Sequence, residues 1–122
     1  MPLEHYENPQ ILPKTVLEQA RALASIIEEL EAIAWYNERA AASEDPRLVA
    51  VLEHNRDEEI EHAVMGLEWL RRNFPGFDEN MRTYLFTSAP ITEIEEKNPT
   101  SQTAAPAQDA SLRIGSMKTK GA

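Results

Sequence analysis

The sequence predicts an all-α fold, in which an antiparallel two-helix hairpin is followed by a short C-terminal helix. A helical apolar period runs from about residue 15 to Ala42 without Gly or Pro. A short turn at Ser43-Glu44-Asp45-Pro46 follows it, and a second period then continues to about Asn73, where Phe74-Pro75-Gly76 ends it. Because the turn is so short, the two helices are expected to fold back on each other.

The first helix is expected to follow an N-terminal arm, residues 1–13, which contains Pro2, Pro9 and Pro13 and shows no apolar period. We expect this arm to be mobile or to depend on a partner for its conformation. Thr15 followed by Glu18 fits a capping box, which predicts that Thr15 caps the first helix. The predicted helix has about 28 residues and is about 42 Å long.

The second helix is expected to begin in the turn, with Asp45 as its cap and Pro46 at its first position. Beyond Gly76, residues 77–97 carry scattered large apolar residues around Pro90, which predicts one or two short helices. Together these elements define a predicted helical domain over residues 14–97.

The C-terminal end has a different composition from the helical domain. Residues 98–110 are mostly Thr, Ser, Gln, Ala and Pro, which is typical of a flexible linker, whereas residues 111–122 are basic and contain Leu112, Ile114 and Met117. Residues 1–97 hold 20 acidic and 9 Lys or Arg residues, and residues 98–122 hold one acidic and three basic ones. The net charge is therefore −11 on the first part and +2 on the second.

Composition narrows the partners of the chain. The formal net charge of −9 over 122 residues argues against a nucleic acid and favours cations. Cysteine is absent, so any metal must be bound by Glu, Asp, His or Tyr. No stretch approaches the roughly 20 apolar residues of a membrane span, and the first residues lack the pattern of a secretory signal. We therefore expect a soluble, cytoplasmic protein without a membrane partner.

The first helix carries two apolar faces. The first face consists of Val16, Ala20, Leu23, Ile27, Leu30 and Ala34, with the 4,3 spacing of a seam between packed helices. The second face consists of Ala22, Ile26, Ile33, Tyr36 and Ala40 and lies roughly 120° around the helix. We expect the first face to pack on the hairpin partner and the second to be buried against another copy of the chain. Glu29 lies in the middle of the second face, where a carboxylate needs a cation or a proton.

The second helix interrupts its apolar face with polar residues. Its apolar positions are Leu48, Leu52, Ala63, Gly66 and Leu70, and Asn55, Glu59 and His62 occupy the same face at its centre. Glu59 and His62 are three residues apart, so their Cβ atoms lie about 5–6 Å from each other and both side chains can bind one metal ion. An ordinary buried Glu–His ion pair is the alternative interpretation.

The number of candidate ligands predicts a dimer. A di-iron carboxylate bundle takes a Glu from each of two helices and a Glu-x-x-His from each of two others. This chain has one helix of each kind, so two copies related by a two-fold axis would complete a four-helix bundle and its metal centre. Oxygen and imidazole ligands without thiolate suit iron or manganese, with zinc able to compete.

Five spaced blocks of the sequence together carry a family resemblance: Glu28-Glu29-Leu30-Glu31, Trp35-Tyr36, His54-Asn55-Arg56-Asp57-Glu58-Glu59-Ile60-Glu61-His62, Leu67-Glu68-Trp69-Leu70-Arg71-Arg72 and Met81-Arg82-Thr83-Tyr84-Leu85-Phe86-Thr87. Over about residues 14–97, the chain resembles the encapsulated ferritins. Residues 111–118 are also similar to the peptides that load such proteins into encapsulin shells. The resemblance implies a ferritin-like four-helix bundle made by dimers, a ring typically of ten subunits, and a ferroxidase that relies on the shell to store iron.

The resemblance also assigns residues to roles. It makes Glu29, Glu59 and His62 the di-iron ligands and places Tyr36 beside the centre. It suggests that Glu28, Glu31 and Trp35 line the approach of the metal. It further suggests that His54, Glu58 and Glu61 form an outer cation site; Ca²⁺ or Zn²⁺ is conceivable at the inner or outer site. The outer trio has the helical spacing of one face, although an exposed acidic face is more often simply solvated.

Three other functions are compatible with the same residues. The chain could be a different di-iron protein that consumes peroxide or scavenges oxygen. It could be a non-enzymatic helical adaptor that dimerises and docks through its tail, in which case it would bind no metal at the two-fold axis. It could also buffer cations on its acidic face without redox chemistry.

Overall fold

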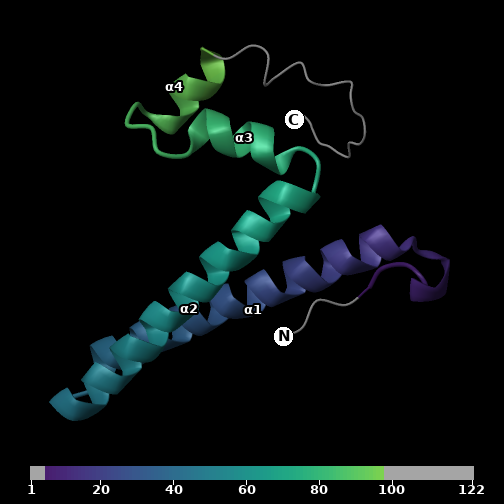
Figure 1. Cartoon of the computed structure of the whole chain (residues 1–122). Helices are drawn as coiled ribbons and strands as arrows, with labels where there is room; N and C mark the ends of the chain where they lie inside the picture. Colours follow the sequence, from purple (N-terminus) through teal and green to yellow (C-terminus); the bar gives the residue numbers. More distant parts are fainter. Residues whose placement is uncertain (1–4, 98–122) are drawn as a thin grey trace. The chain divides into compact units, whose positions relative to one another are not determined.

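The computed structural model describes residues 5–97, and within this range every regular element is a helix (Figure 1). The elements are a short 3₁₀-helix, η1 (Pro9–Ile11), and the helices α1 (Lys14–Ala42), α2 (Pro46–Asn73), α3 (Phe77–Tyr84) and α4 (Ile91–Glu96). The predicted all-α class and the hairpin of two long helices are confirmed, and α3 and α4 agree with the one or two short helices predicted for residues 77–97. The predicted linker 98–110 and the shell-directed peptide 111–122 lie outside the described residues.

The chain divides into two compact units, and the boundary falls within α2, between Trp69 and Leu70. The first unit contains η1, α1 and most of α2. The second contains the last turn of α2 together with α3 and α4. All of the candidate metal ligands belong to the first unit.

The start of α1 differs from the prediction. The helix begins at Lys14, its N-cap is Pro13, and no side chain caps it. Thr15 therefore lies inside the helix and not at its N-cap. The predicted capping box is wrong. The arm before α1 also contains a regular turn, because the Asn8 side chain accepts a hydrogen bond of 2.9 Å from the Gln10 backbone N–H and starts η1.

The turn between α1 and α2 agrees with the prediction. Asp45 accepts a hydrogen bond of 2.9 Å from the backbone N–H of Arg47 through its side chain, and its carbonyl accepts one from Val49. Pro46 takes the first helical position, where its missing N–H leaves no hydrogen bond unmade. The two long helices then run antiparallel and side by side (Figure 1).

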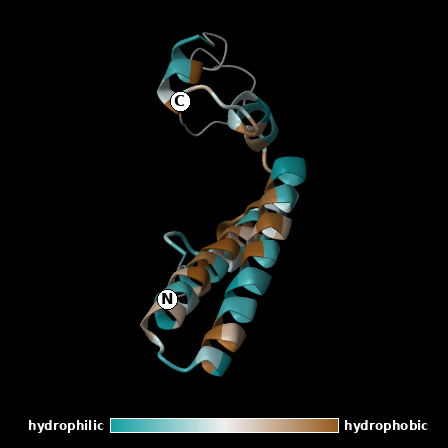
Figure 2. Ribbon diagram, turned by 90° about the vertical axis from the view of Figure 1, so that its left-hand side faces the viewer, coloured by the Kyte–Doolittle hydropathy of each residue, from teal (hydrophilic) through white to brown (hydrophobic). Residues whose placement is uncertain are grey.

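α1 packs on α2 through its second apolar face, and not through the first face as predicted. Ile26 and Ala40, from the second apolar face, are buried, whereas Val16, Ile27 and Leu30, from the first face, are exposed. Figure 2 shows hydrophobic residues along both helices of the hairpin. The expectation that the second face is left for another copy is therefore wrong, because Gly66 of α2 lets α1 approach on its Ile26 side.

In the second unit, a tight connection follows the end of α2. Phe74 and Phe77 pack edge to face with ring centroids 5.2 Å apart, and Gly76 between them has a φ of 101°, which a residue with a side chain rarely adopts. Asp78 accepts hydrogen bonds from Arg82, at 3.0 Å, and from Arg71. These contacts hold α3 on the end of α2, and α3 in turn contacts α4.

No helix among residues 5–97 is long and apolar enough to cross a membrane.

Candidate metal centre

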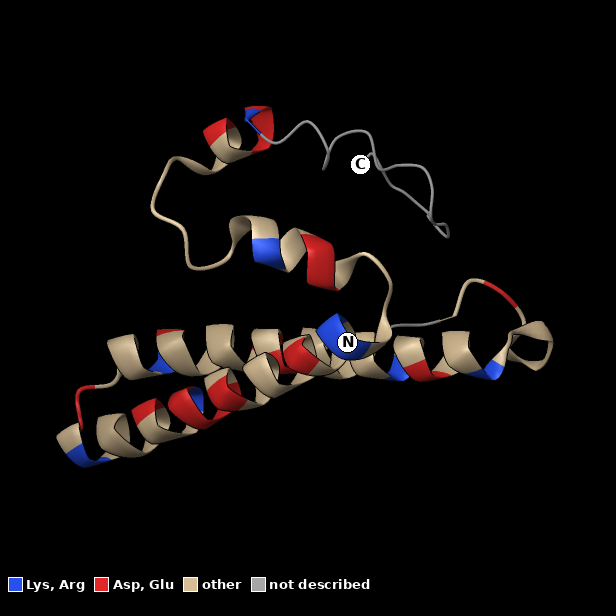
Figure 3. Ribbon diagram, turned by 45° about the horizontal axis from the view of Figure 1, so that its top comes forward, with Lys and Arg blue, Asp and Glu red and all other residues tan. Residues whose placement is uncertain are grey.

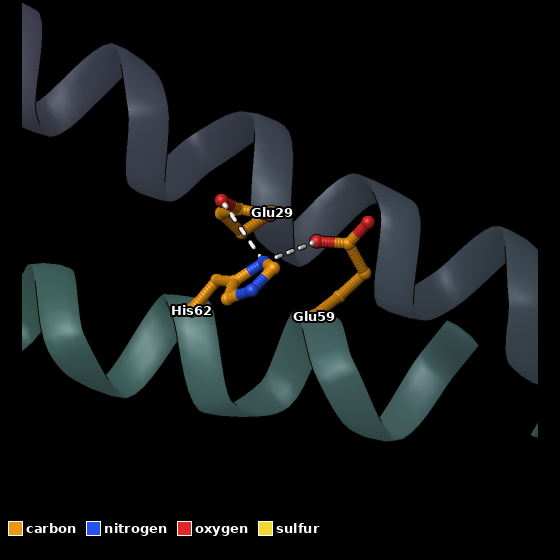
Figure 4. Close-up of side chains that lie close together, drawn as sticks. All are labelled: Glu29, Glu59 and His62. Atoms are coloured by element: carbon orange, nitrogen blue, oxygen red, sulfur yellow. Dashed lines mark hydrogen bonds and ion pairs between the residues drawn. The ribbon is translucent and has the colours of Figure 1, made fainter. Parts of the chain in front are cut away.

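The two long helices bring Glu29, Glu59 and His62 together at one point of the hairpin. Figure 4 shows the Glu29 side chain reaching from α1 toward the Glu59 and His62 side chains of α2. His62 Nδ1 lies 3.2 Å from Glu59 Oε1 and 3.8 Å from Glu29 Oε2. One ligand atom from each of the three residues falls within 4.8 Å of the others. Within residues 5–97, no other group of three or more His, Asp or Glu side chains has this property.

The local sequence explains how the three side chains meet. Glu59 and His62 are one helical turn apart on α2, so both point to the same side of that helix. Glu29 follows Ile26 by one turn of α1, and Ile26 is buried against α2. The packing that buries Ile26 therefore also directs Glu29 toward Glu59 and His62.

A cross-helix hydrogen bond supports the same alignment further along the hairpin. Arg56 donates from its guanidinium to the Asn37 side-chain oxygen at 3.0 Å, and also to Asp57 at 3.1 Å. Asn37 lies two turns beyond Glu29 on α1, and Arg56 lies one turn before Glu59 on α2. The contact thus fixes the register of the helices on one side of the cluster.

The cluster is partly shielded from water but remains open. The side-chain exposures are 29% for Glu29, 25% for Glu59 and 45% for His62. Such an arrangement leaves the ligand atoms reachable by a metal ion from the surface. It differs from the ordinary buried Glu–His pair of the alternative interpretation, because a second carboxylate shares the site and the imidazole is nearly half exposed.

The two carboxyl groups interact strongly. A hydrogen bond with Glu59 raises the pKa of Glu29, and desolvation adds to that increase. The same hydrogen bond, together with one from His62, lowers the pKa of Glu59. In the metal-free cluster, the shared proton therefore favours Glu29 and the negative charge favours Glu59. A divalent cation would stabilise the ionised form of both carboxylates, which share a proton in the absence of the cation.

The outer residues are placed less closely than the inner three. His54 Nε2 lies 3.8 Å from Glu58 Oε2, and Glu58 Oε1 lies 4.0 Å from His62 Nε2, so Glu58 stands between the two histidines on α2. Glu61 is exposed, and within residues 5–97 the trio His54, Glu58 and Glu61 does not come within the metal-binding distances of the inner group. Acidic residues recur along the hairpin (Figure 3).

The remaining candidates lie on α1. Glu28 is exposed, Glu31 is half-buried, and Trp35 is 53% exposed, and their predicted place along the approach of the metal stays a prediction. The ring of Tyr36 is half-buried and packs under the Arg39 guanidinium, whose carbon lies 5.5 Å from the ring centroid. The predicted place of Tyr36 beside the centre stays a prediction.

Sequence reasoning did not single out the contact between Gly66 and Ile26. A Cβ atom built on Gly66 would lie 2.5 Å from Ile26 Cγ1, so the two helices touch at this point. The available signal was a single glycine inside a long helix, which costs about 1 kcal/mol relative to alanine and therefore suggests a packing reason.

Comparison with known proteins gives consistent results. The model of the EncFtn-like family matches residues 4–88. The chain is 48% identical over 125 aligned positions to an encapsulated ferritin-like protein of Rhodospirillum rubrum, which covers 96% of this chain and 89% of the relative. It is 64% identical over 77 residues to a ferritin-like protein of Thermotoga maritima, which covers 63% of this chain and 68% of that one.

A solved structure is similar in fold as well as in sequence. Protein ne0167 from Nitrosomonas europaea superposes with a TM-score of 0.71 at 48% identity. The alignment covers 73% of this chain and 98% of the Nitrosomonas chain.

Proposed function

The chain belongs to the EncFtn-like family, and on that premise we propose that it is a ferroxidase that oxidises Fe(II) to Fe(III) with dioxygen, for iron storage and detoxification inside an encapsulin shell. The observation that carries the proposal is the convergence of Glu29, Glu59 and His62 within 4.8 Å from two helices. Two carboxylates and one imidazole are a ligand set that iron accepts, and the absence of cysteine removes the thiolates that would favour other metals.

Each residue of the cluster has a distinct task. His62 would bind the ion through Nδ1, the nitrogen that faces both carboxylates. Its 3.2 Å contact with Glu59 in the metal-free cluster would then be replaced by binding of both side chains to the ion. Glu29 approaches from the other helix, where it can bridge two ions. Two bound Fe(II) ions supply two electrons, which is enough to reduce dioxygen to peroxide.

Two copies of the chain complete the centre. One chain supplies a Glu helix and a Glu-x-x-His helix, which is half of the ligand set of a di-iron bundle. The small core supports this proposal, because among the described residues only Ile26, Ala40, Ala63 and Leu70 are buried hydrophobic residues. A hairpin with so little buried surface gains stability by association. We therefore propose a homodimer, and with the family resemblance a ring, as the working unit.

The surface around the cluster supports a path for the substrate. Glu28, Glu31 and Trp35 are proposed to line the approach, and His54, Glu58 and Glu61 to form an outer cation site. The contacts of Glu58 with both His54 and His62 connect the outer group to the inner one. An acidic surface raises the local concentration of Fe(II).

Residues 111–118 are proposed to bind the inner wall of an encapsulin shell. The support is the similarity of the chain to the encapsulated ferritin-like protein of Rhodospirillum rubrum, together with the basic charge of this end of the chain. A fusion of residues 98–122 to an inert reporter should co-purify with co-expressed shells, and the reporter without this segment should not. Equal recovery of the two reporters would contradict the assignment.

The ferroxidase proposal is tested by removing the cluster. The triple variant Glu29→Ala, Glu59→Ala and His62→Ala should lose rapid Fe(II) oxidation, followed by Fe(III) absorbance and O₂ consumption in stopped flow. A matched control replaces Glu44, Glu53 and His5, which are exposed residues of the same types elsewhere in the chain, by Ala. Unchanged oxidation by the cluster variant would overturn the proposal. Oxidation of wild type with H₂O₂ but not with O₂ would favour the peroxide-consuming alternative.

A further inference from the structure

Gly66 is the point at which α2 comes closest to the side chain of Ile26. A Cβ atom on residue 66 would lie 2.5 Å from Ile26 Cγ1 and 3.1 Å from its Cδ1, whereas ordinary van der Waals contact begins at 3.4 Å. An alanine at this position would therefore need about 0.9 Å of additional space. Only glycine allows the helices their present separation here.

Ile26 cannot easily provide that space. Its side chain is buried, with 6% exposure, and a β-branched residue in a helix has one strongly preferred χ1 rotamer. The clashing atom Cγ1 is the first carbon beyond Cβ, so it moves only if χ1 or the backbone moves. The simplest response to a larger residue at position 66 is a wider separation of α1 and α2.

The contact lies one helical turn from the metal cluster on both helices. Gly66 is four residues after His62, and Ile26 is three residues before Glu29. Glu29 Oε2 and His62 Nδ1 are 3.8 Å apart, so a widening of about 0.9 Å at the neighbouring turn would separate them by about 4.7 Å. Two ligand atoms that each lie about 2.0–2.2 Å from one ion are at most about 4.4 Å apart, so Glu29 would no longer share an ion with His62.

We propose that Gly66 is a positioning residue for the cluster, in that it sets the helix separation at which Glu29 meets Glu59 and His62. This inference rests on the proposed function insofar as the cluster binds a divalent metal ion, but it does not require the oxidation step. Gly66 touches no ligand atom and acts through Ile26.

The test uses the full chain in its metal-free form, with Co²⁺ as the probe. Its visible absorption reports both affinity and coordination geometry. Gly66→Ala should weaken Co²⁺ binding about ten-fold or more and change the spectrum, a loss of the size found when supports of a metal ligand are removed. Circular dichroism checks that the variant remains helical.

Two double variants separate the steric effect from general loosening. Ile26→Ala with Gly66→Ala removes the clashing atoms and leaves the two Cβ atoms 3.9 Å apart, which is ordinary contact. Ile26→Val with Gly66→Ala keeps a γ carbon at the clashing position. The first pair should bind Co²⁺ within about two-fold of Ile26→Ala alone, and the second pair should remain about ten-fold weaker than Ile26→Val alone.

The outcomes are distinguishable. Equal affinity of wild type and Gly66→Ala would overturn the inference alone, and so would an equal loss in both double variants. The comparison of Ile26→Ala with the Ile26→Ala, Gly66→Ala pair does not depend on the folding of Gly66→Ala. Wild type that binds Co²⁺ but does not oxidise Fe(II) would contradict the proposed function and leave the inference standing. Wild type that binds no Co²⁺ would contradict both.

Discussion

Glu59 interacts with both of the other residues in the cluster, Glu29 and His62. It accepts from His62 at 3.2 Å, and its hydrogen bond with Glu29 raises the pKa of Glu29 while its own pKa is lowered. A neutral side chain of the same shape at this position would remove the negative charge that the cluster concentrates there. Metal binding is therefore expected to be more sensitive to the charge of Glu59 than to the charge of acidic residues elsewhere on α2.

The first prediction concerns this charge. Glu59→Gln should weaken Zn²⁺ binding at least about ten-fold, because it replaces an anionic ligand with a neutral amide of similar size. Isothermal titration of the metal-free protein measures the change. The control is Glu53→Gln, which removes the charge of an exposed residue on the same helix. It should bind Zn²⁺ within about two-fold of wild type. Similar losses in both variants would mean that net charge, and not the cluster, governs binding.

Much of the candidate site could be predicted from single residues in the sequence. The helical period places Glu59 and His62 on one side of α2, and an apolar face isolates Glu29 on α1. The period does not contain the distance between two helices, which depends on side-chain size at each contact. For that reason the Gly66 and Ile26 contact appears only in the three-dimensional structure.

At the scale of elements, helix lengths were predictable and helix faces were not. The ends of α2 and its connections are set by local backbone properties, at Pro46, at Gly76 and in the short turn. Both faces of α1 are apolar, so hydrophobicity alone could not decide which one packs on α2. The Ile26 face is chosen where Gly66 of α2 leaves room for the Ile26 side chain. The predicted capping box failed because α1 begins at Lys14, directly after Pro13, so Thr15 is already inside the helix.

The second prediction concerns the start of α2. Asp45→Ala removes the side-chain acceptor of the Arg47 N–H and should lower the free energy of unfolding by about 1 kcal/mol. Urea denaturation of the metal-free protein, at a concentration that keeps the oligomeric state constant, measures the change. Glu44→Ala, at the neighbouring exposed position, should change it by no more than about 0.5 kcal/mol. Equal effects of the two substitutions would show that Asp45 does not act as a cap.

The third prediction concerns α3 and its pH dependence. The Arg82 and Arg71 guanidinium groups lower the pKa of Asp78. A carboxyl group whose pKa is lower in the folded state stabilises the fold above its unfolded pKa of about 3.9, and that stabilisation is lost as the pH falls through the folded value. Asp78→Asn should therefore reduce the hydrogen-exchange protection of residues 77–84 at pH 7, and this effect should shrink as the pH falls below the unfolded pKa.

Exchange protection of peptides covering α3, measured across this pH range, checks the sign. Glu79→Gln is the matched control on the same helix, because Glu79 is exposed and lies next to Asp78. The difference between wild type and Asp78→Asn should also shrink at high salt, since these side chains are largely exposed. A difference that grows below pH 4 would contradict the assignment.

At the scale of the whole molecule, the first apolar face of α1 is the feature that one chain leaves unused. Ile27 and Leu30 are exposed, and Leu30 has 52% of its surface accessible. On α2, Val51, Ile60 and Val64 are exposed as well. Because a two-helix hairpin has a small core, these side chains supply the apolar area that a second copy would bury. Assembly is therefore expected to use this surface, whereas Glu29 lies on the other apolar face of α1, which packs on α2.

The fourth prediction tests assembly and metal chemistry together. Leu30→Glu places a charge on the apolar face and should shift the protein toward the monomer, because a charged residue is costly to bury in a contact between helices. Ser25→Glu, an exposed position outside both apolar faces, is the matched control and should leave the mass unchanged. Sedimentation with and without Fe(II), combined with O₂ consumption on the same samples, measures both properties.

If two chains share the centre, Leu30→Glu should lose oxidation at the protein concentrations at which it dissociates, and recover part of it at higher concentration by mass action. Full oxidation by a monomeric Leu30→Glu would show that one chain suffices, and would remove the reason for proposing a shared centre.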